Sequence, residues 1–220
     1  MLAPFVKVCC IQSLKEAELA RKLGADLLGF VSKMPSGPGV ITLENISQIV
    51  GQLAPGSKSV LLTSKVNAHD IYRQHLQVGT WGVQLVDRLP TRELILLKKM
   101  LPVTQLIQVI HVQDKTAIDE ALGYSDLVQF ILLDSGNPSG ALKNLGGTGT
   151  THDWEISREI CVRSTLPVLL AGGLNSGNIQ QAVDRVSPAG VDLCSGVRTA
   201  GNLDPLKLQK LMGNLTCGKL

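Results

Sequence analysis

The sequence predicts a single (β/α)8 barrel domain over residues 1–220, and three observations support this fold class. Apolar strand-like runs alternate with amphipathic helical runs along the whole chain, which is typical of a parallel sheet. Eight runs of each kind fit into 220 residues, the usual tally of a closed barrel. The chain is 44% hydrophobic and 18% charged, as in globular proteins. An open doubly wound sheet shows the same alternation and remains the alternative.

The expected strands are continuous apolar runs, as in parallel strands buried on both faces. Start and stop signals mark the helices: Ser13 and Glu16 have capping-box spacing, Pro205 stands at a first helical position, and Gly24 follows the first helix. The predicted strands are 5–11, 26–31, 58–63, 81–86, 105–112, 127–133, 167–171 and 190–194. The predicted helices are 13–23, 43–53, 67–77, 91–100, 114–122, 153–163, 176–186 and 204–213.

Composition argues against several classes of partner. The formal charge is +3, and the basic residues are scattered without interleaved aromatics, so nucleic-acid binding is not expected. No apolar run approaches the roughly 20 residues of a membrane span, and the first residues do not resemble a signal peptide. The five cysteines lack C-x-x-C spacing, which predicts free thiols in the cytoplasm and no metal site. Monomer and homodimer both remain open.

Candidate acid–base residues lie where expected strands end, the part of a barrel that carries catalytic side chains. Cys9 and Cys10 are neighbours in the first strand, so only one of them faces the barrel mouth. A cysteine there is a base or nucleophile if its surroundings lower the pKa, and otherwise an inert small hydrophobe. Asp134 ends an apolar run, where burial would raise its pKa and suit a general acid. The alternative is an aspartate that caps its own loop.

Glycine turns follow the seventh and eighth expected strands. These are Gly172-Gly173 and Ser195-Gly196. In this fold, loop amides and a short helix N-terminus after these two strands commonly bind phosphate. We therefore predict phosphate binding at Gly172, Gly173, Ser195 and Gly196, with plain tight turns as the alternative.

With these residues identified, the chain resembles the phosphoribosylanthranilate isomerase family over almost its whole length. The ordered set of motifs at matching spacing carries the resemblance. Lys7–Ile11 is similar to the family's K-I-C-G-I, and Leu132–Asp134 matches its L-L-D. Further matches are 24–31 with G-A-D-x-x-G-F-[IV], 83–85 with V-Q-L, 146–154 with G-G-[ST]-G-x-x-F-D-W, 171–175 with A-G-G-L-N and 191–197 with V-D-V-S-S-G-V.

The resemblance implies a fold, a reaction and residue roles. Family members are (β/α)8 barrels of tryptophan biosynthesis that convert an aminoaldose into an aminoketose by an Amadori rearrangement. By this resemblance Cys9 is the general base that removes the C2′ proton, and Asp134 is the general acid that opens the sugar. The partner is a small phosphosugar held by amides of the two glycine turns, with Gln84 among the substrate-binding residues, and no cofactor is required.

Four positions depart from the family pattern, all toward the anthranilate end of the substrate. The family's S-P-R loop, whose arginine holds the anthranilate carboxylate, is here Gly37-Pro38-Gly39. Val86-Asp87 replaces H-G, Gln108 replaces a basic residue of the fifth strand, and Arg198 replaces a glutamate. Either Lys33 or Arg198 binds the carboxylate instead, or the enzyme isomerises a different phosphosugar. A non-catalytic paralogue that binds a phosphometabolite is the third possibility.

Overall fold

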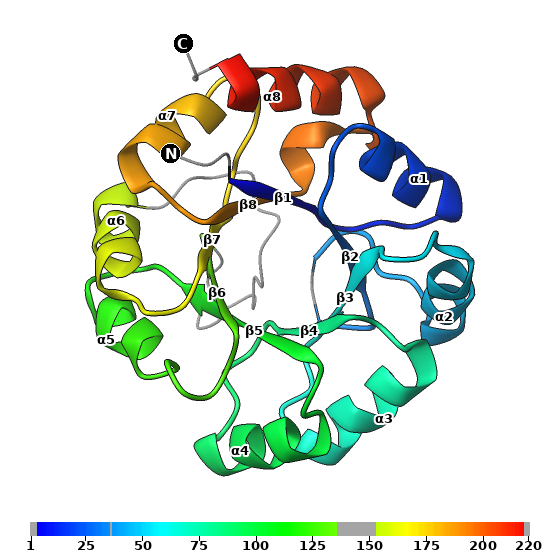
Figure 1. Ribbon diagram of the computed structural model, residues 1–220, viewed down its shortest axis with the longest axis vertical. Helices are drawn as coiled ribbons and strands as arrows, with labels where there is room; N and C mark the ends of the chain where they lie inside the picture. The colour runs from blue at the N-terminus through cyan, green and yellow to red at the C-terminus, as the bar shows by residue number, and fades with distance from the viewer. Residues whose placement is uncertain (1–3, 36, 136–152, 218–220) are drawn as a thin grey trace.

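The computed structural model describes residues 4–35, 37–135 and 153–217. Eight parallel strands, each hydrogen-bonded to the next in chain order, close into a barrel when β8 pairs with β1. Figure 1 looks down the axis of the barrel, and the helices form a layer around the strands. The predicted (β/α)8 fold class is therefore confirmed, and the open-sheet alternative is wrong because the two outermost strands pair.

The strands and helices follow the predicted order. The strands are β1 (Phe5–Val8), β2 (Leu27–Val31), β3 (Lys58–Thr63), β4 (Gly82–Leu85), β5 (Gln105–His111), β6 (Phe130–Asp134), β7 (Val168–Leu170) and β8 (Gly190–Leu193). The barrel helices are α1 (Leu14–Lys22), α2 (Leu43–Gln52), α3 (Ala68–Val78), α4 (Thr91–Met100), α5 (Thr116–Leu122), α6 (Trp154–Arg163), α7 (Ile179–Val186) and α8 (Pro205–Cys217).

Two apolar clusters divide the strand side chains, because successive residues of a strand face opposite sides. The larger cluster joins the outer faces of the strands to the helices and includes Val8, Leu28 and Leu61. The smaller cluster fills the barrel interior and includes Leu27, Val60 and Leu132. In the barrel interior the Phe130 ring contacts those of Phe5 and Trp81, near the first residues of the strands.

Side-chain caps fix where several helices begin. The Ser13 hydroxyl accepts the Glu16 N–H at 3.2 Å, and the Glu16 carboxylate accepts the Gln12 N–H at 3.0 Å. This is the capping box that the sequence predicts. The side chains of Thr42, Asn67 and Asp153 cap α2, α3 and α6 in the same way.

The structure differs from the prediction after β1 and after β8, the two strands whose pairing closes the barrel. β1 stops at Val8 rather than at residue 11, because Cys10 has a positive φ of 65° and cannot continue an extended strand. After β8 the chain forms a short 3-10 helix, η1 (Ser195–Val197), and a two-stranded hairpin of β9 (Arg198–Thr199) and β10 (Asn202–Leu203). These short elements have no periodic pattern that sequence analysis could detect.

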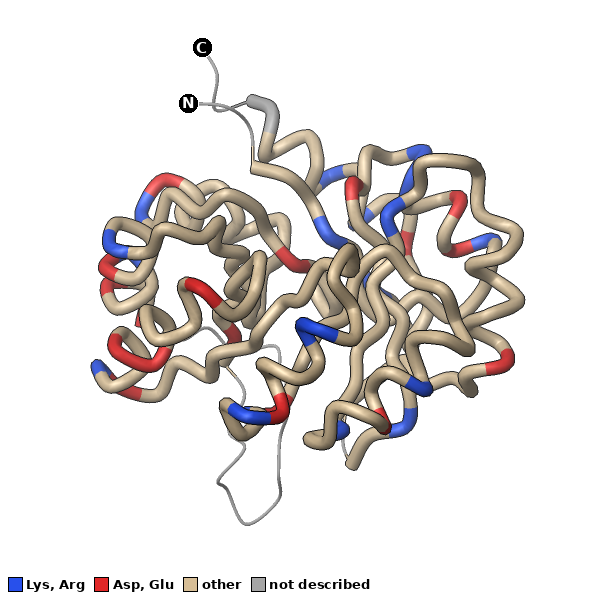
Figure 2. Tube along the Cα trace, turned by 60° about the horizontal axis from the view of Figure 1, so that its bottom comes forward, with Lys and Arg blue, Asp and Glu red and all other residues tan. Residues whose placement is uncertain are grey.

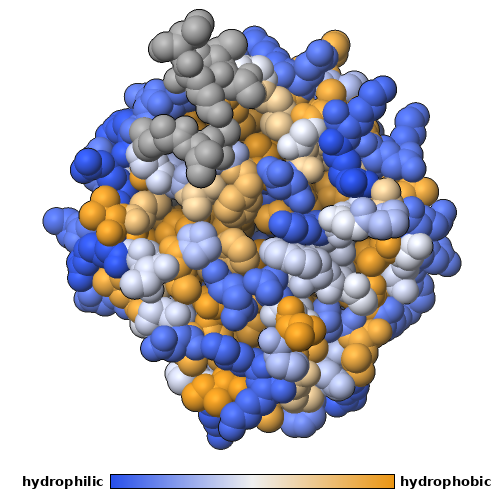
Figure 3. Space-filling model, viewed as in Figure 1, coloured by the Kyte–Doolittle hydropathy of each residue, from blue (hydrophilic) through white to orange (hydrophobic). Residues whose placement is uncertain are grey.

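The surface gives no strong electrostatic signal. In Figure 2 basic and acidic residues are interspersed over both halves of the molecule. Figure 3 shows hydrophilic side chains around the rim of one face, with hydrophobic ones in small patches between them. No helix within the described ranges is both long and apolar enough to cross a membrane.

Candidate active site

A cavity opens where the barrel strands end, with a volume of about 670 Å³ that includes its open mouth. Its wall combines thiols, carboxylates, glycine turns and apolar side chains. The described lining residues are Cys9, Cys10, Val31, Met34, Gly37, Pro38, Leu62, Gln84, Val86, Leu132, Asp134, Ala171, Gly172, Gly173, Leu174, Asp192, Cys194 and Ser195. The structure therefore brings together six of the predicted site residues: Cys9, Asp134, Gln84, Gly172, Gly173 and Ser195.

Cys9 lies just past β1, where its N–H donates to the Leu193 carbonyl at 2.8 Å. Its side chain is buried but reaches the cavity wall. A hydrogen bond from the Cys10 thiol and the nearby Lys7 ammonium outweigh the effect of burial, so the pKa of Cys9 is lowered below its ordinary value. These surroundings favour the thiolate, the reactive form of cysteine.

An internal ion pair lies directly below Cys9 in the barrel. Lys7 and Asp192 are register partners on β1 and β8, and Lys7 Nζ lies 2.9 Å from each Asp192 carboxylate oxygen. Lys7 has no exposed surface. Burial favours its neutral amine, but Asp192 and the Cys9 thiolate outweigh burial and hold the pKa of Lys7 above its ordinary value. Sequence reasoning missed this pair, although Lys7 and Asp192 are the charged residues within two apolar strands.

Asp134 ends β6, and His111 of β5 is its register partner. Burial raises the pKa of the Asp134 carboxyl, while His111 and the Ser135 amide oppose that shift. One carboxylate oxygen accepts the Ser135 N–H at 2.8 Å. Asp134 therefore caps its own loop, and its carboxyl group is also buried at the cavity wall.

The two glycine turns adopt conformations that need glycine. Gly172 and Gly173 have φ values of 86° and 63°. A Cβ on Gly196 would lie 2.0 Å from the Leu174 carbonyl oxygen, so no side chain fits where the two turns meet. Ser195 and Gly196 open η1, and the first N–H groups of a helix have no intrahelical acceptor. Such free amides beside a cavity suit an anion.

Gln84 is another polar residue of the wall and is only 4% exposed. Its Oε1 has no hydrogen-bond partner among the described residues. A buried acceptor of this kind is costly unless something donates to it. Gln84 therefore presents a buried acceptor at the cavity wall.

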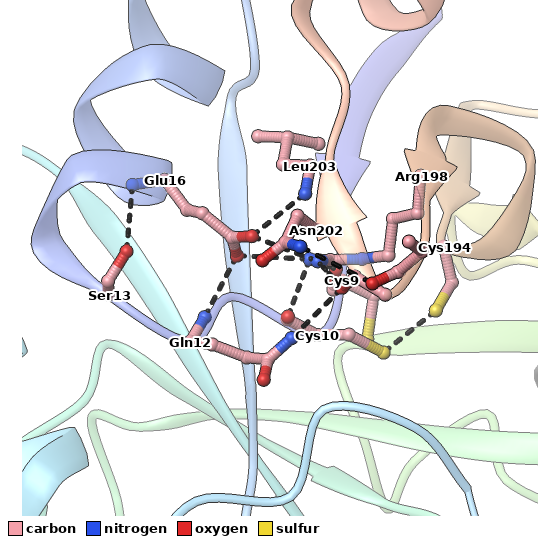
Figure 4. A network of polar contacts seen from close by, with 11 residues as sticks. Cys9, Cys10, Gln12, Ser13, Glu16, Cys194, Arg198, Asn202 and Leu203 are labelled. Carbon is pink, nitrogen blue, oxygen red and sulfur yellow. Dashed lines mark hydrogen bonds and ion pairs between the residues drawn. The ribbon is translucent and has the colours of Figure 1, made fainter.

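The two cations proposed for the substrate carboxylate do not line this wall. Lys33 has an exposed side chain outside the described lining residues. Arg198 is 7% exposed, and Figure 4 shows it within a network of polar contacts that includes Glu16 and Cys10. It donates to the carbonyl oxygens of Cys9 and Cys10 and contacts the Glu16 carboxylate at 3.1 Å. The structure thus gives Arg198 internal partners in place of a substrate carboxylate.

Two further features limit what the described site can be. The part of the chain that the structure describes contains no cluster of three or more His, Cys, Asp or Glu side chains able to hold a metal ion. The expected G-G-[ST]-G motif at residues 146–149 and the rest of the 136–152 connection lie outside the described residues.

Comparison with known proteins agrees with this geometry. The family model described as "N-(5'phosphoribosyl)anthranilate (PRA) isomerase" matches residues 6–214. The chain belongs to the PRA isomerase family. The PRA isomerase of Methanosarcina acetivorans is 31% identical, with 96% of this chain and 93% of that protein covered. The resemblance read from the ordered motifs is thereby confirmed.

Solved PRA isomerase structures have the same architecture. The Thermotoga maritima crystal structure superposes with a TM-score of 0.83 at 29% identity and covers 97% of this chain and 99% of its own. A second PRA isomerase structure, with a TM-score of 0.80 at 27% identity and the same coverage, holds reduced 1-(o-carboxyphenylamino)-1-deoxyribulose 5-phosphate. Against this family, Cys10, Gly39 and Arg198 of the present chain stand out as departures from the motifs.

Proposed function

We propose that this chain catalyses the Amadori rearrangement of N-(5′-phosphoribosyl)anthranilate to the corresponding 1-deoxyribulose 5-phosphate. The observation that carries the proposal is a pair of buried groups at one cavity with opposite pKa shifts. The pKa of Cys9 is lowered by the Cys10 hydrogen bond and by Lys7, and the pKa of Asp134 is raised by burial. Such a pair offers one group suited to act as a base and one suited to act as an acid.

The rearrangement begins with two proton transfers, and each residue performs one. The Asp134 carboxyl protonates the ring oxygen of the sugar while the C1′–O bond breaks and the nitrogen lone pair forms a C1′=N bond. The Cys9 thiolate then removes the C2′ proton, and the C–H electrons neutralise the iminium to give an enolamine. Loss of the enol O–H proton and protonation of C1′ give the ketone, and proton exchange with solvent returns Asp134 to the acid and Cys9 to the thiolate. No electrons enter or leave, so the reaction needs no redox cofactor.

The phosphate end of the substrate fits the two glycine turns. The amides of Gly173, Ser195 and Gly196 provide donors and a helix N-terminus for a dianion. Gly172 keeps the first turn open, because a Cβ there would lie 2.9 Å from the Ser135 hydroxyl. Anchoring the phosphate fixes the distance from C1′ and C2′ to the acid and the base. The proposal applies equally to a monomer and to a homodimer.

One observation favours a second candidate, an isomerase of a phosphosugar that lacks the carboxylate. The lining residues that the structure describes include no Lys, Arg or His. Assay of N-(5′-phosphoribosyl)anthranilate by its loss of fluorescence separates the candidates. Turnover supports the main proposal, whereas binding of inorganic phosphate without turnover contradicts it and favours the other substrate or a non-catalytic paralogue.

Three variants test the assigned roles. Cys9→Ala and Asp134→Asn are each expected to lower kcat by roughly 10²–10⁴-fold, the usual contribution of a positioned acid or base. Cys161→Ala is the matched control, because Cys161 lies on α6 outside the cavity wall and burial raises its pKa to about 12. Full activity of Cys9→Ala would contradict the assignment of the base.

A further inference from the structure

Two of the departures named above, Gly39 and Arg198, lie beside the cavity together with two further differences from the motifs, Cys10 and Cys194. Cys10 stands where K-I-C-G-I has glycine, and Gly39 stands where the S-P-R loop has arginine. Cys194 replaces the first serine of V-D-V-S-S-G-V, and Arg198 replaces the following glutamate. The structure brings all four together, because Cys10 contacts each of the other three.

The contact between Cys10 and Gly39 excludes a side chain at position 39. A Cβ built on Gly39 would lie 2.5 Å from Cys10 Cβ, 2.9 Å from Cys10 Cα and 3.1 Å from the Cys10 carbonyl oxygen. Carbon atoms in ordinary contact are about 3.5–4.0 Å apart. Gly39 also has a φ of 74°, which strains any other residue. The Cys10 side chain gives the shortest of these distances, and the backbone of residue 10 gives the other two.

Cys10 cannot move aside to make room, because its neighbours hold it in place. The Arg198 guanidinium binds the carbonyl oxygens of both Cys9 and Cys10. On the other side, Cys10 Sγ lies 2.8 Å from Cys194 Sγ, as Figure 4 shows. These contacts stabilise a φ of 65° at Cys10, a conformation that otherwise costs a non-glycine residue about 1–2 kcal/mol.

We propose that Cys10 is a specificity-determining residue of this site. By filling the space beside Gly39 it replaces a cationic wall with an uncharged one made of Cys10, Met34, Gly37 and Pro38. The ligand class that suits this wall is an N-aryl phosphoribosylamine whose aromatic ring need not carry a carboxylate. The proposal rests on the proposed function and adds a substrate range to it.

The first test compares two substrates, N-(5′-phosphoribosyl)anthranilate and its decarboxylated counterpart N-(5′-phosphoribosyl)aniline. A charge-assisted contact contributes about 1.5–3 kcal/mol, which corresponds to roughly 10–150-fold in binding. The native chain is expected to discriminate between the two by less than tenfold in kcat/KM. The double variant Cys10→Gly/Gly39→Arg is expected to gain at least tenfold preference for the anthranilate. A native preference above a hundredfold would overturn the proposal.

Two control variants separate the volume of Cys10 from its thiol chemistry. The controls are Gly39→Arg alone and Gly39→Arg combined with Cys10→Ala. Both keep a Cβ at position 10, so neither is expected to gain preference for the anthranilate substrate. Cys10→Ala removes the thiol without removing the obstruction. If Gly39→Arg alone gains as much preference as the Cys10→Gly/Gly39→Arg variant, Cys10 is not the determinant.

A stability cycle tests the same contact without any substrate. Gly39→Ala is expected to lower the Tm in the native background and to lower it less when Cys10→Gly is also present. The destabilisation that alanine suffers from the positive φ at position 39 is the same in both backgrounds, so it cancels when the two losses of Tm are compared. Equal losses in the two backgrounds would contradict the steric coupling. Absence of turnover would instead count against the proposed function, so the two failures are distinguishable.

Discussion

Cys9 and Cys10 are adjacent in the chain and have opposite electrostatic surroundings. The Cys10 hydrogen bond and Lys7 lower the pKa of Cys9. Hydrogen bonding to Cys194 and to Cys9, together with burial, raises the pKa of Cys10 well above its ordinary value. Donation by Cys10 thus makes its neighbour the better thiolate. This difference arises from tertiary contacts, so neither residue's reactivity could be predicted from the dipeptide alone.

Thiol alkylation should reveal this difference. Because the pKa of Cys9 is lowered, its reaction with iodoacetamide is expected to reach its plateau rate at a lower pH than that of a free cysteine. Stopped samples analysed by intact-mass spectrometry give the rate at each pH. The fast phase should disappear in Cys9→Ala and persist in Cys161→Ala. A fast phase that survives Cys9→Ala would assign the reactive thiol elsewhere.

At the scale of elements, the β9–β10 hairpin and α1 are joined through Glu16. The Glu16 carboxylate accepts the Leu203 N–H at 2.8 Å and also binds Arg198 and the Gln12 N–H. Burial disfavours the charged form, but these contacts outweigh burial and lower the pKa of Glu16. A residue that the sequence identifies only as part of a capping box therefore also holds the β9–β10 hairpin beside Cys9 and Cys10.

The lowered pKa of Glu16 predicts acid sensitivity. A carboxylate whose pKa is lower in the folded state stabilises that state at neutral pH, and the contribution is lost as pH falls below the ordinary value of 4.5. Urea unfolding from pH 7 to pH 3 should therefore show a smaller loss of stability in Glu16→Gln than in the native chain. Glu18→Gln, on the same helix, is the matched control. Parallel curves for Glu16→Gln and the native chain would refute the prediction.

The fold could be predicted from the sequence because each barrel element has its own hydrophobic period and turn signals. Family motifs then identified Cys9 and Asp134 as candidates, and the structure places both at one cavity. What could not be predicted depends on contacts between residues far apart in the chain. Arg198 was expected to face the substrate, but it lies 3.1 Å from Glu16, 182 positions earlier. Likewise, no local pattern shows that Gly39 lies against Cys10.

On the scale of the whole molecule, the barrel interior is packed with side chains at one end of its axis and holds a cavity at the other. Aromatic side chains fill one end, where Phe5 and Phe130 have ring centroids 6.0 Å apart and a Cβ on Gly190 would lie 2.6 Å from the Phe5 ring. The opposite end holds the cavity with Cys9. Between them, Gly29 leaves room for Lys7, whose Nζ would lie only 3.1 Å from a Cβ there. The ion pair thus separates the packed end from the open end.

The Lys7–Asp192 pair is expected to act on both stability and thiol reactivity, and two variants separate these effects. Lys7→Met leaves the Asp192 carboxylate buried without its cation, which should cost about 3–5 kcal/mol in unfolding free energy. Lys7→Met/Asp192→Leu removes both charges and should recover most of that stability in guanidinium unfolding. The alkylation pKa of Cys9 should nevertheless stay above the native value in the double variant, because Lys7 lowers this pKa more than Asp192 raises it. If stability and the native thiol pKa were both recovered, the pair would be structural and would have no part in preparing the base.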